Sequence, residues 1–157
     1  MYFRPFNLFV IFISLCLVQS CRDDFNICTL GRDVKFNVGF YKKTGSIETI
    51  NTAPNFSIFL LGGSTPIISQ ANTSAFSIPL NITVDSAKYV LTMDTSLPKD
   101  TITIIYSSKS EVISAECGTA VFNTISKITT TLNTIDSVKI ISPEVNTLGL
   151  QNAKIYF

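Results

Sequence analysis

Residues 34–41, which read V-K-F-N-V-G-F-Y, contain the alternation that decides the fold of this chain. Every second residue is apolar, namely Val34, Phe36, Val38 and Phe40. Successive side chains of a β-strand point to opposite faces, so a period of two places these four on one face. The segment therefore predicts a half-buried strand.

Similar segments follow along the chain, rich in β-branched residues and separated by turn residues. No stretch has helix caps or a sustained period of 3.6. Strands at such spacing are typical of a sandwich or an open barrel. We expect an all-β fold with a single antiparallel β-sandwich, immunoglobulin-like or transthyretin-like. Pro79 cannot donate to a ladder, so its strand should lie at an edge or end there. The predicted strands are 34–41, 56–61, 76–80, 88–93, 100–106, 111–117, 122–132, 138–142 and 153–157.

The first 20 residues have the pattern of an export signal. Arg4 is their only charged residue, and the apolar run 8–18 is interrupted by Ser14 alone. This run is too short to cross a hydrocarbon core, which takes about 20 residues. We expect residues 1–20 to be a cleaved signal peptide. The alternative is a buried N-terminal strand or helix.

The end of the signal, Val18-Gln19-Ser20-Cys21, resembles a bacterial lipobox. It has an aliphatic residue at minus three and a small one at minus one, and Cys21 is then the lipidation site. Acyl chains contribute about 0.8 kcal/mol per buried CH₂ and hold a protein at a membrane. The expected organisation is a signal peptide at 1–20, a lipidated tether at 21–32 and a sandwich domain at 33–157. The alternative is a plain cleavage site with Cys21 as an ordinary thiol.

The four cysteines limit the covalent chemistry of the exported chain. Cys16 leaves with the signal and Cys21 carries lipid, so Cys28 and Cys117 remain in an oxidising compartment. The economical pairing is a disulfide between them. The chain-entropy model gives it about 4.6 kcal/mol as an upper estimate. A metal site is the alternative, although two cysteines without any histidine make a poor zinc shell.

Several short motifs together resemble a family of small Bacteroidota lipoproteins, the domain of unknown function numbered 6452. The resemblance covers nearly the whole mature chain and supports the pairing of Cys28 with Cys117, but it implies no activity or ligand. The motifs are the lipobox followed by Asp-Asp, Cys28, V-K-F-N-V-G-F-Y (34–41), F-S-I-P-L-N (76–81), D-T-I-T-I-I-Y (100–106), S-A-E-C-G (114–118) with Phe122, and I-D-S-V-K-I (135–140).

If the chain is such a lipoprotein, two further sequence features suggest a surface-export signal and O-glycosylation sites. Arg22, Asp23 and Asp24 look like the signal that sends Bacteroidota lipoproteins to the outer cell surface; the alternative is a solvated tether with incidental charges. Asp-Ser/Thr-aliphatic motifs resemble that phylum's O-glycosylation acceptor. Ser86, expected in a loop, and Ser137 are the candidates. Thr101 carries the same motif within a predicted strand.

Composition excludes several function classes. The chain has no histidine, which removes Ser-His-Asp and Cys-His catalysis and the commonest general base. Without Arg4, the 12 basic residues fall to the number of acidic residues, 11, so no basic surface is expected for nucleic acid. We expect no catalytic residue, no cofactor and no metal. Four acidic residues are nearby in sequence, but acids at strand ends are usually solvated or paired: Asp94, Asp100, Glu111 and Glu116.

These observations lead to two expectations for function. The first is a lipid-anchored, non-catalytic protein of the outer membrane, facing the cell exterior or the periplasm. It would have a binding or structural role and present loops or an edge strand to another envelope component. The second is an accessory carbohydrate-binding lipoprotein that uses exposed tyrosines (Tyr41, Tyr89 and Tyr156) together with loop carboxamides. Two or more tyrosines in one flat exposed patch would support the second; enzyme activity is a distant third.

Overall fold

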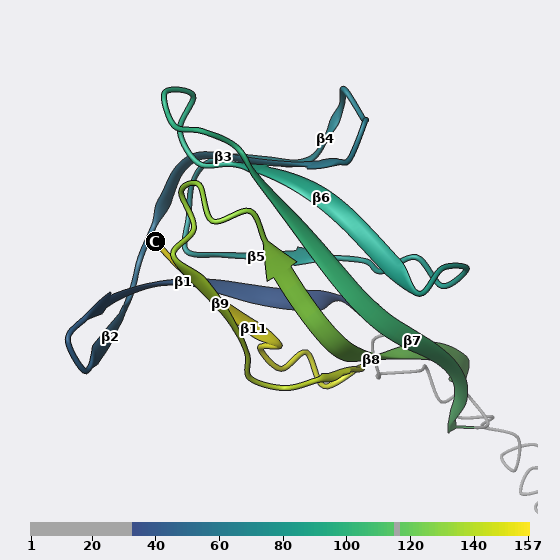
Figure 1. Ribbon diagram of the computed structural model, residues 1–157. Helices are drawn as coiled ribbons and strands as arrows, with labels where there is room; N and C mark the ends of the chain where they lie inside the picture. The colour runs from purple at the N-terminus through teal and green to yellow at the C-terminus, as the bar shows by residue number, and fades with distance from the viewer. Residues whose placement is uncertain (1–32, 115–116) are drawn as a thin grey trace, which may run out of the picture.

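The computed structural model describes residues 33–114 and 117–157. Every regular element in these ranges is a β-strand, and the strands form a 5-stranded and a 6-stranded sheet (Figure 1). This arrangement confirms the predicted all-β sandwich. The strands are β1 (Phe36–Thr44), β2 (Ile47–Ile50), β3 (Ala53–Leu60), β4 (Pro66–Thr73), β5 (Ala75–Ile78), β6 (Ser86–Thr92), β7 (Asp100–Ser114), β8 (Gly118–Thr130), β9 (Ser137–Ile140), β10 (Glu144–Val145) and β11 (Ala153–Tyr156).

The first sheet has the order β2-β1-β11-β9, with β5 paired to the start of β1. The pair β1–β11 is parallel, whereas the other strand pairs are antiparallel. As predicted, the C-terminal segment is docked in a sheet, between β1 and β9. Strand β5 ends at Ile78, directly before Pro79, and pairs with β1 alone among the described strands. The edge position expected for this strand is therefore confirmed.

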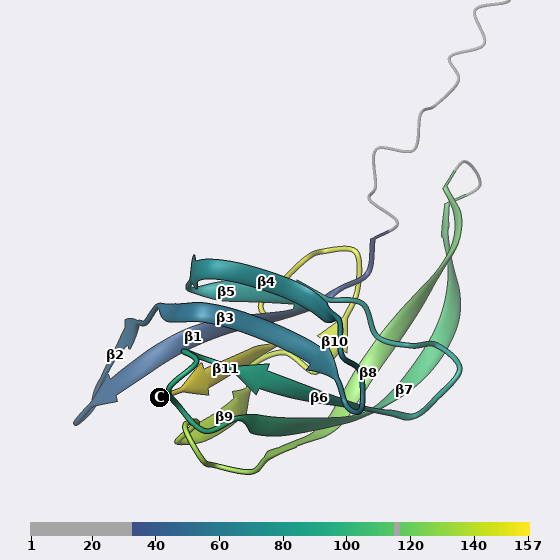
Figure 2. The same ribbon diagram turned by 90° about the horizontal axis from the view of Figure 1, so that it is seen from above.

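The second sheet has the order β10-β8-β7-β6-β3-β4. Its longest strands, β7 and β8, continue as a paired hairpin beyond the sandwich, at the end away from the C-terminus (Figure 2). The expectation of separate strands at 100–106 and 111–117 is wrong, because β7 runs unbroken to Ser114. The polar residues between them do not end the strand, since the ladder to β8 continues there. Gly118 has φ 71°, the left-handed conformation expected for the bend.

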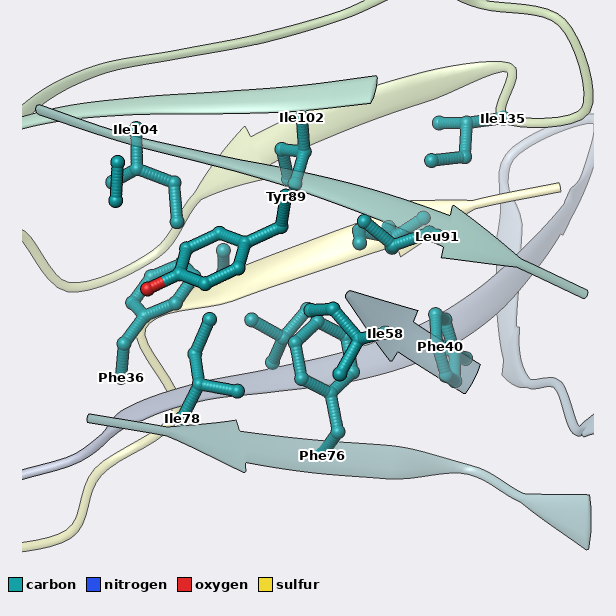
Figure 3. Packing of buried hydrophobic residues seen from close by; sticks show 14 of the residues in the cluster. Phe36, Phe40, Ile58, Phe76, Ile78, Tyr89, Leu91, Ile102, Ile104 and Ile135 are labelled. Atoms are coloured by element: carbon teal, nitrogen blue, oxygen red, sulfur yellow. The ribbon is translucent and has the colours of Figure 1, made fainter. Parts of the chain in front are cut away.

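Apolar side chains from both sheets fill the space between them (Figure 3). The inward face of β1 supplies Phe36, Val38 and Phe40, which are at most 2% exposed. Phe40 is the centre of an aromatic group, with its ring centroid 5.2 Å from that of Phe56 and 5.5 Å from that of Phe76. The alternation that predicted the fold thus marks the core face of β1.

Three strands, β2, β4 and β10, were not predicted. All four residues of β2 are exposed, and so are six of the eight residues of β4. A strand without a buried face has no hydrophobic alternation, so its sequence carries little strand signal. These strands form because an adjacent strand offers a ladder: β1 for β2, β3 for β4 and β8 for β10. Within the described ranges, no helix has the length and apolar character needed to cross a bilayer.

Candidate functional site

A shallow recess lies on the outer face of the first sheet, above the middle of β1. Val38 and Phe40 point into the core, so Gly39 between them faces outward. Its partner across the ladder is Ala75 of β5, and these two small residues form the floor. The recess has a volume of about 350 Å³. We call it the Gly39 recess, and its lining includes Asn37, Gly39, Tyr41, Ile50, Ser77 and Gln151.

One end of the Gly39 recess is polar. Asn37 of β1 and Ser77 of β5 are also ladder partners, and Asn37 lies two residues before Gly39 along β1. The Ser77 hydroxyl donates to Asn37 Oδ1 at 2.6 Å, and Asn37 Nδ2 donates to the carbonyl of Leu150 at 3.2 Å. These bonds fix the orientation of the Asn37 amide before any ligand arrives.

The other end is aromatic and aliphatic. Tyr41 of β1 is the ladder partner of Ile50 of β2, and the Ile50 side chain is 72% exposed. The Tyr41 hydroxyl donates to Gln151 Oε1 at 3.1 Å. The Gln151 amide lies over the floor, because a Cβ placed on Gly39 would overlap Gln151 Nε2 and lie 2.8 Å from Tyr41 Cε2. Glycine at position 39 therefore makes room for both side chains.

A charged cluster lies on the same outer face beside the recess, where Lys154 of β11 is the ladder partner of Gly39. Lys154 Nζ lies 2.7 Å from Glu48 Oε2 and 4.4 Å from the centroid of the Tyr41 ring. The Tyr156 hydroxyl donates to Glu48 Oε1 at 3.0 Å. Hydrogen bonds from Lys154 and Tyr156 lower the pKa of Glu48, and the bond to Glu48 raises the pKa of Lys154. Burial, together with the bond to Glu48, raises the pKa of Tyr156.

The tyrosines do not form the flat exposed patch considered from the sequence. Tyr89 is 4% exposed and Tyr156 is 6% exposed, so the expectation that both are exposed is wrong. Tyr89 points into the core from β6, and its hydroxyl donates to the carbonyl of Pro79 at 3.4 Å. Tyr156 does face outward, but Tyr41 packs beside it with ring centroids 6.1 Å apart. Of these three tyrosines, Tyr41 is the one that borders the recess.

Three of the four acidic residues considered for catalysis lie in the described ranges, and each has a structural partner. The buried Asp100 carboxylate accepts hydrogen bonds from the loop between β8 and β9. Asp94 accepts from the backbone N–H of Ser96 at 3.1 Å, and Glu111 lies 3.1 Å from Lys109 Nζ on the projecting hairpin. Glu116 lies outside the described residues. In the described part of the chain, no group of three Asp, Glu or Cys side chains is close enough to hold a metal ion.

The predicted lipidation and export residues, Cys21, Arg22, Asp23 and Asp24, lie outside the described residues, as does Cys28. Cys117 is described and is 3% exposed, at the start of the turn into β8. Its backbone N–H donates to Ser114 Oγ at 3.0 Å. The pairing of Cys28 with Cys117 stays a prediction.

The two candidate glycosylation residues occupy similar positions. Ser86 is the first residue of β6 and Ser137 is the first residue of β9, and both are exposed. The expectation of a loop position for Ser86 is wrong, since it pairs with Ile105 of β7. Thr101 lies within β7, as expected, and pairs with Val90.

The described chain is thus a β-sandwich domain with an uncharged recess on one outer face. The chain belongs to a family of unknown function (DUF6452), whose family model matches residues 55–157. This match confirms the resemblance to that family over residues 55–157, whereas the lipobox, Cys28 and the 34–41 motif lie before the matched range. No curated protein and no solved structure matches the chain. The matched range begins after β1 and β2, so Gly39 and Tyr41 lie before it, whereas Ser77 and Gln151 lie within it.

Sequence reasoning identified Tyr41 but missed the remainder of the recess. The available signal was Gly39, since a glycine inside an apolar strand marks a close approach of backbone or ligand. Ser77 and Gln151 carried no comparable signal. They reach Gly39 through the ladder of β1 with β5 and through the segment that leads into β11.

Proposed function

We propose that this protein is a lipid-anchored, non-catalytic binding protein of the cell envelope, and that the Gly39 recess is its binding site. The observation that carries the binding role is the recess itself. Two small ladder partners leave a hollow of about 350 Å³ between a polar end and an aromatic end. Ligand sites are concave, with volumes from about 300 Å³ upward, and combine apolar walls with a few placed polar groups.

Support for the lipid anchor comes from the sequence. Residues 1–20 have the charge and hydropathy pattern of a signal peptide, and Cys21 stands at the lipobox position. The motif at Arg22, Asp23 and Asp24 favours the outer membrane, with the domain facing the cell exterior. If this motif does not act as an export signal, the domain would face the periplasm. In either location the partner is another envelope component, a protein or a glycan.

Support for a non-catalytic role comes from the available chemistry. The chain lacks histidine, and the lining of the recess contains no Asp, Glu, Lys, Cys or Arg among the described residues. General acid–base catalysis needs a positioned group that exchanges a proton near the operating pH. Amide and serine side chains without a neighbouring base do not supply one.

The anchor is tested by feeding cells an alkyne-labelled fatty acid and comparing the full chain with two cysteine variants. The unmodified chain and Cys16→Ser should carry the label and sediment with membranes, because Cys16 lies within the cleaved signal. Cys21→Ser should lose the label. Equal labelling of all three chains would contradict lipidation at Cys21.

The binding site is tested by photo-crosslinking in living cells from two positions of matched exposure. Ile50, at the rim of the recess, is 72% exposed, and Val112, on the projecting hairpin, is 73% exposed. A photoreactive residue at 50 should give a discrete adduct with an envelope component, whereas one at 112 should not. The same adducts from both positions, or none from position 50, would contradict a binding role for the recess.

A further inference from the structure

The Gly39 recess has a chemistry that selects one class of ligand. We infer that it binds a neutral sugar ring, an inference that rests on the proposed binding function. Three features of the recess favour such a ligand: its lining carries no charged side chain, its two ends differ in character, and its amides have a fixed orientation.

The lack of charged side chains in the recess limits which ligands it can bind. The polar side chains that line the recess are Asn37, Tyr41, Ser74, Ser77 and Gln151, and none of the described lining residues is Asp, Glu, Lys, Arg or Cys. Lys154 lies beside the recess, as the ladder partner of Gly39 in β11 and with Nζ over the Tyr41 ring, but its charge is paired with Glu48 at 2.7 Å. A buried ionised ligand needs a charged or multiply donating partner. The recess therefore favours an uncharged ligand over a phosphate, a carboxylate or an ammonium group.

The two ends then define what the uncharged ligand must present. The Tyr41 ring and the Ile50 side chain offer an apolar wall, and the Asn37 amide and the Ser77 hydroxyl lie across the floor from it. A pyranose ring has a face of C–H groups and a rim of hydroxyls, so it can meet both walls at once. The Gln151 amide covers Gly39, so a ring would reach the sheet surface at the exposed Ala75, with the Gln151 amide beside it. A volume of about 350 Å³ lies near the lower limit for ligand sites, so it suits one ring better than an extended chain.

The polar groups of the recess are already oriented. Gln151 accepts from the Tyr41 hydroxyl at 3.1 Å through Oε1, and its Nε2 end lies over Gly39. The Asn37 amide is held between Ser77 and the Leu150 carbonyl. Side chains fixed in advance lose less conformational entropy when a ligand binds. An amide side chain has both a hydrogen-bond donor and an acceptor. A sugar hydroxyl also donates and accepts, so the two groups can pair.

This mode differs from the tyrosine platform considered from the sequence. The platform needs several exposed tyrosines, and only Tyr41 borders the recess because Tyr156 is buried beside it. A site with a single aromatic wall and amides opposite it binds one sugar ring at a time. The aromatic wall contacts one face of that ring, and the amides contact the hydroxyls at its edge. We therefore expect weak binding to isolated sugars and selection by ring stereochemistry.

The test is binding of the full chain, purified in mild detergent, to an array of oligosaccharides. The array contains glycans with neutral hexose or N-acetylhexosamine ends, matched glycans with uronic acid ends, and short neutral peptides. Neutral sugar ends should bind, and Gly39→Ala should weaken that binding at least tenfold, because its methyl group displaces Gln151 from the floor. Ser77→Ala, at an exposed position with little effect on folding, should weaken it several-fold. Thr103→Ala, on the outer face of the second sheet, is the control and should bind as the unmodified chain does.

Three results would overturn the sugar inference: no binding to neutral sugars, preference for uronic acids or peptides, or sugar binding that Gly39→Ala and Ser77→Ala leave unchanged. The binding function itself is judged separately by the adduct formed from position 50. If that adduct forms, is lost in Gly39→Ala and contains no glycan, the recess remains a binding site and the sugar inference is wrong. If no adduct forms and no sugar binds, both proposals are wrong.

Discussion

Asp100 Oδ2 accepts a hydrogen bond from the backbone N–H of Ile135 at 3.0 Å, and both residues are about 1% exposed. The same oxygen accepts from the N–H of Thr134 at 2.8 Å, and Oδ1 accepts from the N–H of Asn133 at 2.7 Å and from the Thr131 hydroxyl at 2.8 Å. One carboxylate at the start of β7 thus holds the loop between β8 and β9. Its oxygens are occupied by the fold and do not face a ligand.

Replacing Asp100 by asparagine should destabilise the protein. The change puts an NH₂ group against backbone donors and removes charge-assisted bonds, so we expect a loss of about 2–3 kcal/mol in the free energy of unfolding. Urea denaturation measures it. Asp136→Asn, at an exposed position in the same part of the chain, should stay within about 0.5 kcal/mol of the unmodified protein. An equally small effect at position 100 would contradict the structural role of this carboxylate.

Stability should also depend on pH through Asp100. Burial raises the pKa of this carboxyl, but hydrogen bonds from Asn133, Thr134, Thr131 and Ile135 outweigh burial and hold the pKa below its usual value. Since the folded pKa is the lower one, the stabilisation is fully present above the unfolded pKa, about 3.9. It is lost as the pH falls through the folded pKa.

The measurement is the free energy of unfolding of the unmodified protein and of Asp100→Asn from pH 6 down to pH 2.5. The difference between the two should be constant down to about pH 4 and shrink below it, because protonation removes the charge that asparagine lacks. A difference that does not change with pH would show that the Asp100 charge contributes nothing to stability.

Phe40 should be among the most sensitive core positions. It is fully buried, and its ring centroid lies within 5.5 Å of those of Phe56, Phe76 and Phe157. Phe40→Ala leaves a cavity between the sheets, and we expect a loss of about 3–5 kcal/mol in thermal or urea unfolding. Phe59→Ala, on the half-buried outer face of β3, is the matched control and should lose clearly less. Equal losses would mean that the aromatic group is not the centre of the core.

The charged cluster on the first sheet predicts a shifted tyrosine titration. Burial, followed by the bond to Glu48, raises the pKa of Tyr156. In Glu48→Gln the Tyr156 pKa should fall toward its ordinary value while remaining above it, because burial persists. Titration of tyrosinate by ultraviolet absorbance or by NMR measures the change. Glu144→Gln, which changes a carboxylate bound to Thr124 on β8, should leave the Tyr156 pKa unchanged.

Cys28 and Cys117 should form a disulfide. Without reduction, the denatured full chain should show no alkylatable thiol at Cys28 or Cys117, and peptide mass spectrometry should find the two linked. Reduction should lower stability by up to about 4.6 kcal/mol. Cys21→Ser should leave the link intact. Alkylation of both thiols in unreduced protein would refute the pairing.

Much of the fold could be predicted from the sequence because it depends on the burial of every second residue. The alternation in β1, and that of Ile102, Ile104 and Tyr106 in β7, marks core faces that the structure confirms. The exposed strands β2 and β4 have no such pattern and were missed. Tyr89 was placed on the wrong face, because its neighbours Val90 and Leu91 are also apolar and a local pattern does not show which side is buried.

The sequence by itself determined the all-β class, the family, the lack of histidine chemistry and the core face of the first strand, since each depends on residue type and local order. Only the tertiary structure decided the site. Gly39, Ala75 and Gln151 are far apart in the chain, and the ladders that bring them together depend on pairing between strands. The recess exists because two paired positions on neighbouring strands, Gly39 and Ala75, carry little or no side chain. The register that pairs them is a property of the folded sheets and not of any segment alone.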